Sequence, residues 1–163
     1  MVVRRARESD CAEIARLLKI IAAQHGAGRP DLFDASCGKY DVAGVAALFS
    51  GNAVFVAESK NGGISGYLIA TLKDQPKIAV RKACRSLYID DLCVDPESRR
   101  QGVGKALFEA AKAFAAENGC YHIELNVWEF NGDARAFYER MGMTTQKRTM
   151  ELLTTTSNQD NGR

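Results

Sequence analysis

The hydrophobic residues of this chain switch between a strand-like and a helix-like repeat, and the switches mark the predicted elements. Residues Tyr88 to Val94 alternate and are rich in β-branched side chains, which predicts a half-buried strand. A helix follows, whose apolar residues share one stripe: Val103, Leu107, Ala110, Ala111 and Phe114. Gly119 ends this helix, and a strand from Tyr121 to Trp128 precedes a helix that runs from Asn131 to Gly142. The order strand, helix, strand predicts a right-handed crossover between parallel strands.

The rest of the chain contains shorter predicted elements, turn signals and one basic stretch. The predicted elements are a strand over 2–6, a helix from Ser9-Asp10 to a point before Gly26, a helix over 41–49, a hairpin of strands 52–57 and 64–72, and an edge strand from Met143 to Leu153. The basic stretch from Lys73 to Arg85 is interpreted as a loop or a mobile strand extension. Residues 154–163 have no large apolar side chain, so we expect a disordered tail.

The composition is that of an ordinary globular chain. With 163 residues, 46% hydrophobic and 26% charged, it predicts one domain over 1–153. A net charge of +2 is too small to indicate nucleic acid, and no apolar run approaches the length of about 20 residues that a membrane span needs. The N-terminus lacks the apolar core of a signal peptide. Five cysteines without metal-ligand spacing predict free thiols, no metal and a cytoplasmic location.

The turn before the predicted helix at Val103 has the features of an anion site. The first N–H groups of a helix have no intrahelical partner, and the helix dipole adds partial positive charge there. Glycines at 102 and 104 leave space for a ligand, and three basic residues surround them: Arg99, Arg100 and Lys105. A pyrophosphate suits such a site. Ala106 excludes a Walker loop, and Leu107 stands where the dinucleotide fingerprint needs glycine.

This turn and the segments around it resemble the GNAT superfamily of N-acetyltransferases. The matching motifs are Tyr88-Ile89-Asp90-Asp91-Leu92-Cys93-Val94, Asp95-Pro96-Glu97, the Arg/Gln-x-x-Gly-x-Gly/Ala loop at Arg99 to Gly104, and Asn131-x-x-Ala134-x-x-Phe137-Tyr138-Glu139-x-x-Gly142. The resemblance implies an α+β fold with a mixed central sheet of about six to seven strands, in which two parallel central strands splay apart. Many family members have a further C-terminal strand for which this chain is too short, so a homodimer built on that edge is left open.

The resemblance also implies acetyl-CoA as co-substrate and assigns residues to it. They are Leu92, Cys93 and Val94 through their backbone, the loop residues Arg99, Arg100, Gln101, Gly102, Val103, Gly104 and Lys105, and Asn131 and Tyr138. Cys93 is better explained as a small buried apolar residue than as a nucleophile. Asn131 also suits the cap of the helix that it precedes, and both roles are compatible.

Acetyl transfer from a thioester to an amine needs a base for the amine, because a free alkylamine has a pKa of about 10.4. Asp90 and Asp91 are the candidates, and the resemblance to diamine N-acetyltransferases favours Asp90. Side chains alternate along a strand, so only one of the two should face the cleft unless a bulge intervenes. The alternative is a surface carboxylate that pairs with Arg85 or Lys82.

The departing thiolate needs a proton or a hydrogen bond, and Tyr138 is the candidate. In the family, the tyrosine at this position is the general acid. Full proton transfer from a phenol to a thiolate is uphill by about 2 kcal/mol, which favours a hydrogen-bond donor instead. The alternative is that Phe137 and Tyr138 only pack their helix against the sheet.

We therefore expect an acetyl-CoA-dependent N-acetyltransferase that transfers the acetyl group directly to the primary amine of a small molecule. A protein N-terminus or lysine is the alternative acceptor, and a non-catalytic acyl-CoA-binding module is the alternative class. The acceptor pocket is expected near residues 24–38. Trp128 either lines that pocket or packs at the rim of the sheet. The stretch from Lys73 to Arg85 is either a solvated loop or a basic segment that helps to bind an anion.

Overall fold

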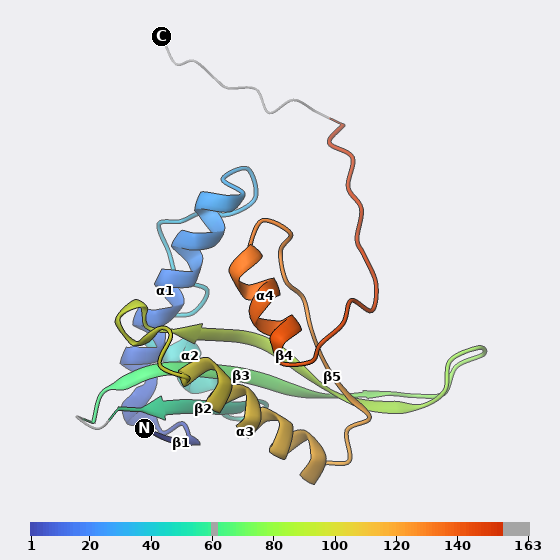
Figure 1. The fold of residues 1–163 in the computed structure, drawn as a ribbon, viewed down its shortest axis with the longest axis horizontal. Helices are drawn as coiled ribbons and strands as arrows, with labels where there is room; N and C mark the ends of the chain where they lie inside the picture. Colours follow the sequence, from blue (N-terminus) through green and yellow to red (C-terminus); the bar gives the residue numbers. More distant parts are fainter. Residues whose placement is uncertain (60–61, 155–163) are drawn as a thin grey trace.

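The computed structural model describes residues 1–59 and 62–154 and contains one mixed five-stranded sheet (Figure 1). The strand order is β1-β2-β3-β4-β5, with antiparallel pairs from β1 to β4 and a parallel pair of β4 with β5. The strands are β1 (Val2–Arg5), β2 (Ala53–Glu58), β3 (Ile64–Gln75), β4 (Cys84–Val94) and β5 (His122–Leu125). The predicted α+β class with a mixed sheet is confirmed, although the sheet has five strands among the described residues rather than six to seven.

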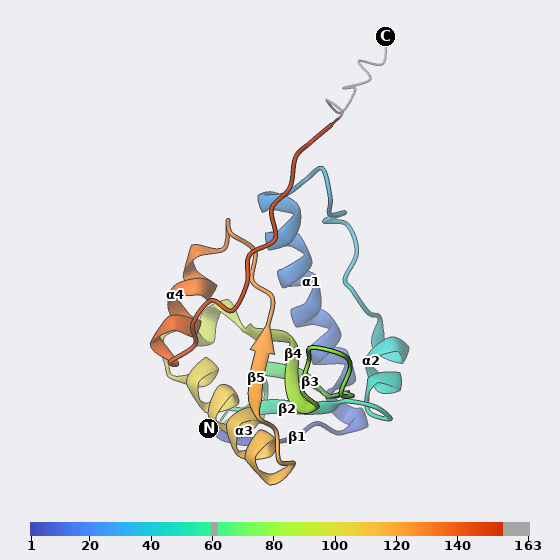
Figure 2. The ribbon, with the colours of Figure 1, turned by 90° about the vertical axis from the view of Figure 1, so that its right-hand side faces the viewer.

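Helices cover both faces of the sheet. Figure 2 shows α1 (Cys11–Gly28) and α2 (Val42–Leu48) on one side, and α3 (Val103–Glu117) and α4 (Gly132–Arg140) on the other. The α1 face is packed by residues such as Ile14 and Tyr67, and the α3 face by residues such as Leu68 and Leu107. These helices match the predicted ones, except that α1 continues past Gly26 to Gly28.

The two parallel strands pair over only four residues each. Their register runs from Ser86 opposite His122 to Ile89 opposite Leu125, and β4 then continues to Val94 without a partner in β5. The predicted splay of the two central strands is therefore present. The backbone of residues 90–94 therefore has no hydrogen-bonded partner in β5.

A β-bulge interrupts β4 at the point where the strands separate. Ile69 of β3 pairs with Asp91 and the next residue, Ala70, pairs with Ile89, so Asp90 is an extra residue in β4. Ile89 belongs to the core under α3, whereas Cys93 belongs to the core under α1. The bulge thus reverses the alternation of side chains along the strand.

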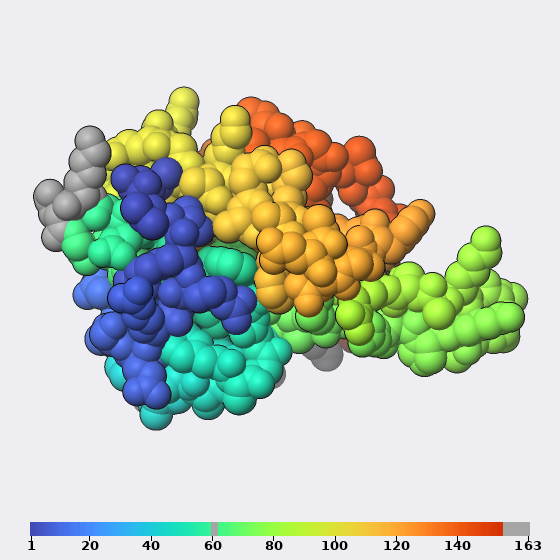
Figure 3. Space-filling view, turned by 90° about the horizontal axis from the view of Figure 1, so that it is seen from below, coloured from blue at the N-terminus to red at the C-terminus, as the bar shows by residue number. Residues whose placement is uncertain are grey.

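The β3–β4 hairpin projects from the body of the protein, as the green lobe of Figure 3 shows. Its strands reach Gln75 and begin again at Cys84, and an isolated bridge joins Ile78 to Arg81. The strand extension is therefore the correct interpretation at the two ends of the stretch, residues 73–75 and 84–85, and the loop is the correct one for the residues between them.

The predicted edge strand from Met143 to Leu153 is wrong. The described part of the C-terminal segment forms no strand and runs away from the sheet (Figure 1), with Met150, Leu152 and Leu153 exposed. Residues 144–149 have no large apolar side chain to bury against the sheet, and within residues 1–59 and 62–154 strand β5 pairs with β4 alone. Apart from Thr154, the predicted disordered tail lies outside the described residues.

Candidate active site

The turn before α3 has the geometry of an anion cradle. Gly102 caps the helix with φ 81°, a left-handed conformation that favours glycine. The first helical hydrogen bond runs from Ala106 N to Gly102 O at 3.0 Å. The N–H groups of Val103, Gly104 and Lys105 therefore point out of the helix end, where they are available to a negatively charged ligand.

The side chains of the cradle divide into exposed and packed groups. Arg99, Arg100 and Lys105 are exposed, so their charges surround the turn. The Gln101 side chain instead donates from Nε2 to the carbonyl of Glu97 at 3.0 Å. A Cβ at Gly104 would lie 3.3 Å from the ring of Phe137. This glycine is thus needed for packing of α3 against α4, in addition to any ligand approach.

The end of β4 brings Leu92, Cys93 and Val94 beside this turn. Leu92 and Val94 pack into the core under α3, whereas Cys93 is buried under α1, with its Sγ 3.7 Å from the carbonyl of Leu17. Burial and the nearby Asp91 raise the pKa of Cys93 to about 12. A thiol this weakly acidic is a packing residue rather than a nucleophile.

Tyr138 lies on α4, half-buried against the rings of Phe108 and Phe137, with centroids at 6.3 and 5.1 Å. Burial raises its pKa, and the negative charge of Asp91 raises it further. The phenol therefore remains protonated at neutral pH and is able to donate a hydrogen bond. The influence of Asp91 on its pKa indicates that the two predicted catalytic groups share one region of the protein.

Asp91 is the more perturbed of the two carboxylates. Burial, opposed by the charge of Lys39 and helped by that of Asp90, raises its pKa to about 6. It lies beside Tyr67 of β3, whose fully buried hydroxyl has no hydrogen-bond partner of normal geometry among the described residues, although it is close enough to affect the pKa of Asp91. The half-buried Asp91 and the buried Tyr67 thus form a polar pair, in which the Tyr67 hydroxyl has unused hydrogen-bonding capacity.

Asp90 faces the loop between α1 and α2. Its Oδ2 accepts a hydrogen bond from Lys39 Nζ at 2.6 Å, and 29% of its side chain is exposed. Arg85, one of the alternative partners, instead pairs with Asp74. Burial lowers the pKa of His25, near the end of α1, and the charge of Lys39 lowers it further; the same charge opposes the rise in the pKa of Asp91.

An aromatic cluster formed by His25, Phe33, Trp128 and Phe130 gathers at that end of α1. Phe33 contacts His25 and Trp128 at centroid distances of 5.0 and 5.3 Å, and Trp128 stacks on Phe130 at 5.9 Å. Phe130 also lines a surface pocket of about 460 Å³ between α1 and α4, together with Gln24, Ala27, Gly28, Asn131, Gly132 and Asp133. Asn131 caps α4 by accepting from Ala134 N at 3.2 Å, as predicted.

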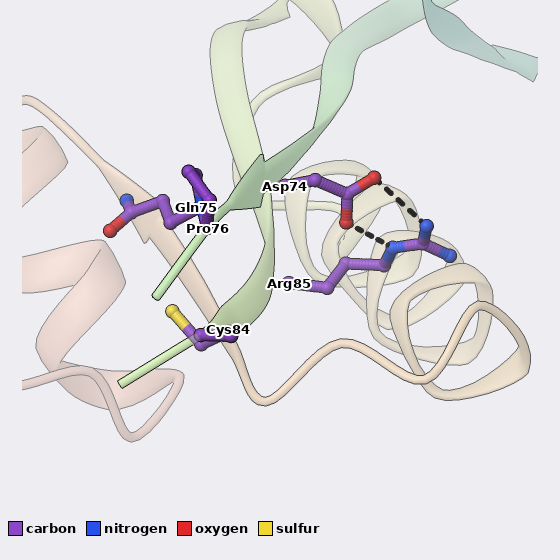
Figure 4. Close-up of a pocket in the computed structure, with 6 residues that line it drawn as sticks. Asp74, Gln75, Pro76, Cys84 and Arg85 are labelled. Carbon is purple, nitrogen blue, oxygen red and sulfur yellow. Dashed lines mark hydrogen bonds and ion pairs between the residues drawn. The ribbon is translucent and has the colours of Figure 1, made fainter. Parts of the chain in front are cut away.

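A second pocket lies on the projecting hairpin and is lined by Asp74, Gln75, Pro76, Ala83, Cys84 and Arg85 (Figure 4). Its volume is about 520 Å³, but its chief polar feature is an ion pair that joins Asp74 to Arg85 at 2.6 Å. None of the predicted site residues lines it. The larger pocket therefore does not coincide with the candidate chemistry.

Several residues of this region were not singled out from the sequence. Tyr67 occurs in an aliphatic strand, Lys39 in an irregular loop, and Phe33 and Phe130 in turns. No local motif marks them, because their roles depend on contacts between distant segments. Trp128 and the position of residues 24–38 were the only available signals.

No group of three or more His, Cys, Asp or Glu side chains in 1–59 and 62–154 is arranged to hold a metal ion. Over the same residues, no helix is long and apolar enough to cross a membrane.

The sequence profile of the acetyltransferase (GNAT) family matches residues 14–143, so the chain belongs to this family. It is similar to thialysine N-epsilon-acetyltransferases: 27% identical to the mouse protein over 142 residues, which are 86% of this chain and 82% of the mouse protein. It is also 34% identical to a glucosamine 6-phosphate N-acetyltransferase of Trypanosoma brucei brucei over 51% of this chain and 54% of that protein. The match to the bovine thialysine enzyme spans only 34% of that enzyme's length.

Solved structures give the same classification. A Bacillus halodurans protein, crystallised as a mutant, superimposes with a TM-score of 0.91 at 32% identity, over 95% of this chain and 100% of that chain. An acetyltransferase of Trypanosoma brucei superimposes with a TM-score of 0.67 at 25% identity, over 93% of this chain and 97% of the other. The GNAT fold predicted from the motifs is therefore confirmed.

Proposed function

We propose that this protein is an acetyl-CoA-dependent N-acetyltransferase that acts directly on the primary amine of a small molecule. The observation that carries the proposal is the bulge at Asp90, which places two carboxylates beside Lys39 and the splayed end of β4. One of them, Asp91, has a pKa of about 6, suited to a base near neutral pH. Relatives named for thialysine and glucosamine 6-phosphate acetylation support a small acceptor.

The cradle before α3 fits the pyrophosphate of CoA. Three outward N–H groups, the left-handed Gly102 and the exposed charges of Arg99, Arg100 and Lys105 meet at one helix end. Backbone groups of Leu92, Cys93 and Val94 would hold the pantetheine arm, and Asn131 and Tyr138 would lie at its reactive end. Gln101 and Val103 contribute backbone rather than side chains, since the first is bonded to Glu97 and the second is buried. Bound acetyl-CoA supplies the acetyl thioester.

Asp91 is proposed to accept the proton of the acceptor amine, directly or through a water. An alkylammonium with a pKa of about 10.4 loses its proton to an ordinary aspartate only at a cost of about 9 kcal/mol. The raised pKa of Asp91, about 6, lowers that cost by about 3 kcal/mol. Tyr67 would hold the carboxylate or the water through its unused hydroxyl.

Asp90 is proposed to anchor the acceptor as an ammonium ion. It already binds one ammonium, that of Lys39, at 2.6 Å. The aromatic cluster next to it would hold the rest of the acceptor, and a pocket of about 460 Å³ lies in the range of small-ligand sites. Both features favour a small molecule over a protein acceptor.

Tyr138 is proposed to stabilise the departing thiolate by donating a hydrogen bond. Its raised pKa keeps the proton on the phenol and makes complete transfer to sulfur less favourable. Its packing between Phe108 and Phe137 fixes the ring in place.

Release of free thiol from acetyl-CoA tests the proposal. The acceptor panel contains thialysine, glucosamine 6-phosphate, aliphatic diamines, and peptides with a free N-terminus or lysine. Turnover of one or more small amines, faster than that of the peptides, is expected. If CoA binds but no amine of the panel releases thiol, the catalytic proposal is wrong and the acyl-CoA-binding module takes its place.

A homodimer is proposed on the open edge of β5. Among residues 1–59 and 62–154 no strand pairs with this edge, and the nearby C-terminal segment exposes Met150, Leu152 and Leu153. A second copy related by a two-fold axis would cover both features at once. Light scattering should give twice the chain mass for the wild type and a monomer for Met150→Asp/Leu152→Asp. A monomeric wild type at micromolar concentration would contradict it.

We also propose a cytoplasmic location, because all five cysteines are free thiols in the structure and thiols remain reduced in the cytoplasm.

A further inference from the structure

Lys39 occupies the position that the proposed function gives to the acceptor amine. Its Nζ lies 2.6 Å from Asp90 Oδ2, and its charge also acts on Asp91. No other lysine in the described residues forms an ion pair with these two carboxylates. The chain therefore presents a primary amine of its own to the pair of carboxylates that would bind an external amine.

The segment that carries Lys39 is irregular and connects α1 to α2. Between Arg29 and Asp41, its backbone–backbone hydrogen bonds are two turn bonds, from the N–H groups of Leu32 and Phe33 to the carbonyl of Arg29. The Lys39 side chain is 44% exposed, and its ammonium lies 5.5 Å from the ring of Tyr40. A lysine on such a loop is able to move by small backbone changes while its amine remains near the carboxylates.

Asp91 connects the lysine with the tyrosine at the other side of the site. The charge of Lys39 lowers the pKa of Asp91, and the charge of Asp91 raises the pKa of Tyr138. Asp91 is therefore coupled electrostatically both to Lys39 in the α1–α2 loop and to Tyr138 in α4.

From this arrangement we infer that Lys39 is a site of intramolecular acetylation by the acyl-CoA thioester, which rests on the proposed acetyltransferase function. The Lys39 ammonium gives one proton to the Asp91 carboxylate, and the neutral nitrogen forms a bond to the thioester carbonyl carbon. The carbon–sulfur bond breaks, and the sulfur leaves as CoA thiolate, stabilised by the Tyr138 hydroxyl. The second amine proton passes to solvent or to the thiolate. The products are N-acetyl-Lys39 and CoA.

Acetylation of Lys39 changes the electrostatics of the site. The amide is uncharged, so Asp90 loses its partner and becomes free to bind an external ammonium. Asp91 loses the neighbouring charge that lowers its pKa. Unmodified Lys39 thus competes with the acceptor, and the modified side chain no longer does.

The test is incubation of the full chain with acetyl-CoA alone, followed by intact mass and peptide mapping. We expect one acetyl group per chain, at Lys39, with a first-order rate that does not depend on protein concentration. Lys19 is the matched internal control, because it is exposed, lies next to Gly38 and belongs to the same face. Lys39 should react at least about tenfold faster than Lys19. Lys39→Arg should remain unmodified at this position, and Lys19→Arg should be acetylated like the wild type.

A second readout needs no acetyl-CoA. The ammonium of Lys39 should titrate above the ordinary range of lysine in the free protein, and Asp90→Asn should bring its pKa back down.

Equal acetylation of Lys39 and Lys19, or a rate that rises with protein concentration, would overturn the inference. If small amines release thiol from acetyl-CoA while Lys39 stays unmodified, the inference is wrong and the proposed function stands. If neither occurs, both are wrong.

Discussion

The ring of Phe130 lies directly against the backbone of Gly28, at the end of α1. A Cβ at position 28 would approach this ring to 2.3 Å, well inside contact distance. Gly28 therefore allows the turn after β5 to close on α1 and sets the position of Phe130, which stacks on Trp128. The aromatic side of the proposed acceptor pocket depends on this one close approach.

Gly28→Ala should displace Phe130 and weaken acceptor binding, with little effect on the affinity for CoA. Trp128 is the single tryptophan, so its fluorescence reports the change directly. We expect a shifted emission spectrum and a KM for the amine raised by about tenfold. Gly51→Ala is the control, because its Cβ would meet nothing within 4 Å. Identical spectra for the two variants would show that Phe130 is not held in this way.

Tyr138→Phe separates the catalytic role of the tyrosine from its packing. The variant keeps the ring against Phe108 and loses only the hydroxyl that donates to the thiolate, so kcat should fall by about 10²–10³-fold with CoA affinity retained. Tyr121→Phe serves as the matched control, since that side chain is 84% exposed and outside the site. A rate within about twofold of wild type would show that Tyr138 only packs its helix and takes no part in catalysis.

The pH profile distinguishes Asp91 from Asp90. Asp91 is a base only when ionised, so kcat/KM of the wild type should rise with pH through about 6. Asp91→Asn should remove this limb and lower kcat, whereas Asp90→Asn should keep the limb and raise KM for the amine. If Asp90→Asn alone abolishes the limb, the two roles are reversed.

The raised pKa of Asp91 also predicts how the free energy of unfolding depends on pH. Its folded value of about 6 lies above the unfolded value of about 3.9, so between these two pH values the folded state binds the proton and the unfolded state does not. The stability that this proton gives is present below about 4 and lost as the pH rises through 6. Asp91→Asn should therefore raise the free energy of unfolding at pH 7, by about 2 kcal/mol after allowance for partial exposure.

Urea unfolding at several pH values tests this prediction. The advantage of Asp91→Asn over wild type should shrink between about pH 6 and pH 4. A variant that is less stable than wild type at pH 7 would indicate that the ionised carboxylate contributes to the fold, contrary to this account.

Lys105→Glu tests the anion cradle more cleanly than a change at Gly104, which would disturb Phe137. The substitution places negative charge in the first turn of α3, beside the outward N–H groups. CoA affinity, measured by calorimetry, should fall by about 10–100-fold, or about 1.4–2.7 kcal/mol. Lys112→Glu, on the same helix but away from its start, should bind CoA like the wild type.

The sequence predicted those parts of the protein that depend on local signals. The helix after the cradle, the cap at Asn131 and the parallel strand pair follow from spacing, turn residues and the crossover rule. The edge strand from Met143 to Leu153 was predicted on the same grounds and is absent, because a strand pattern does not guarantee a partner strand in the same chain.

The candidate site was predicted only in part, for a physical reason. Motifs singled out Asp90, Asp91 and Tyr138 as candidates, but the bulge that interrupts β4 at Asp90 depends on the register of β4 against β3. The pairing of Lys39 with Asp90 joins residues 51 positions apart. No local pattern encodes such a contact, which is why the sequence suggests Arg85 or Lys82 as a partner for the carboxylate and not Lys39.

The most direct test of the central claim is a product balance. Wild-type protein with acetyl-CoA and a small amine that it turns over should form N-acetylated amine and free CoA in equal amounts, measured by mass spectrometry and thiol titration. Asp91→Asn and Tyr138→Phe should each reduce both products together. CoA release without acetylated amine, or undiminished acetylation in both variants, would contradict acetyl transfer at this site.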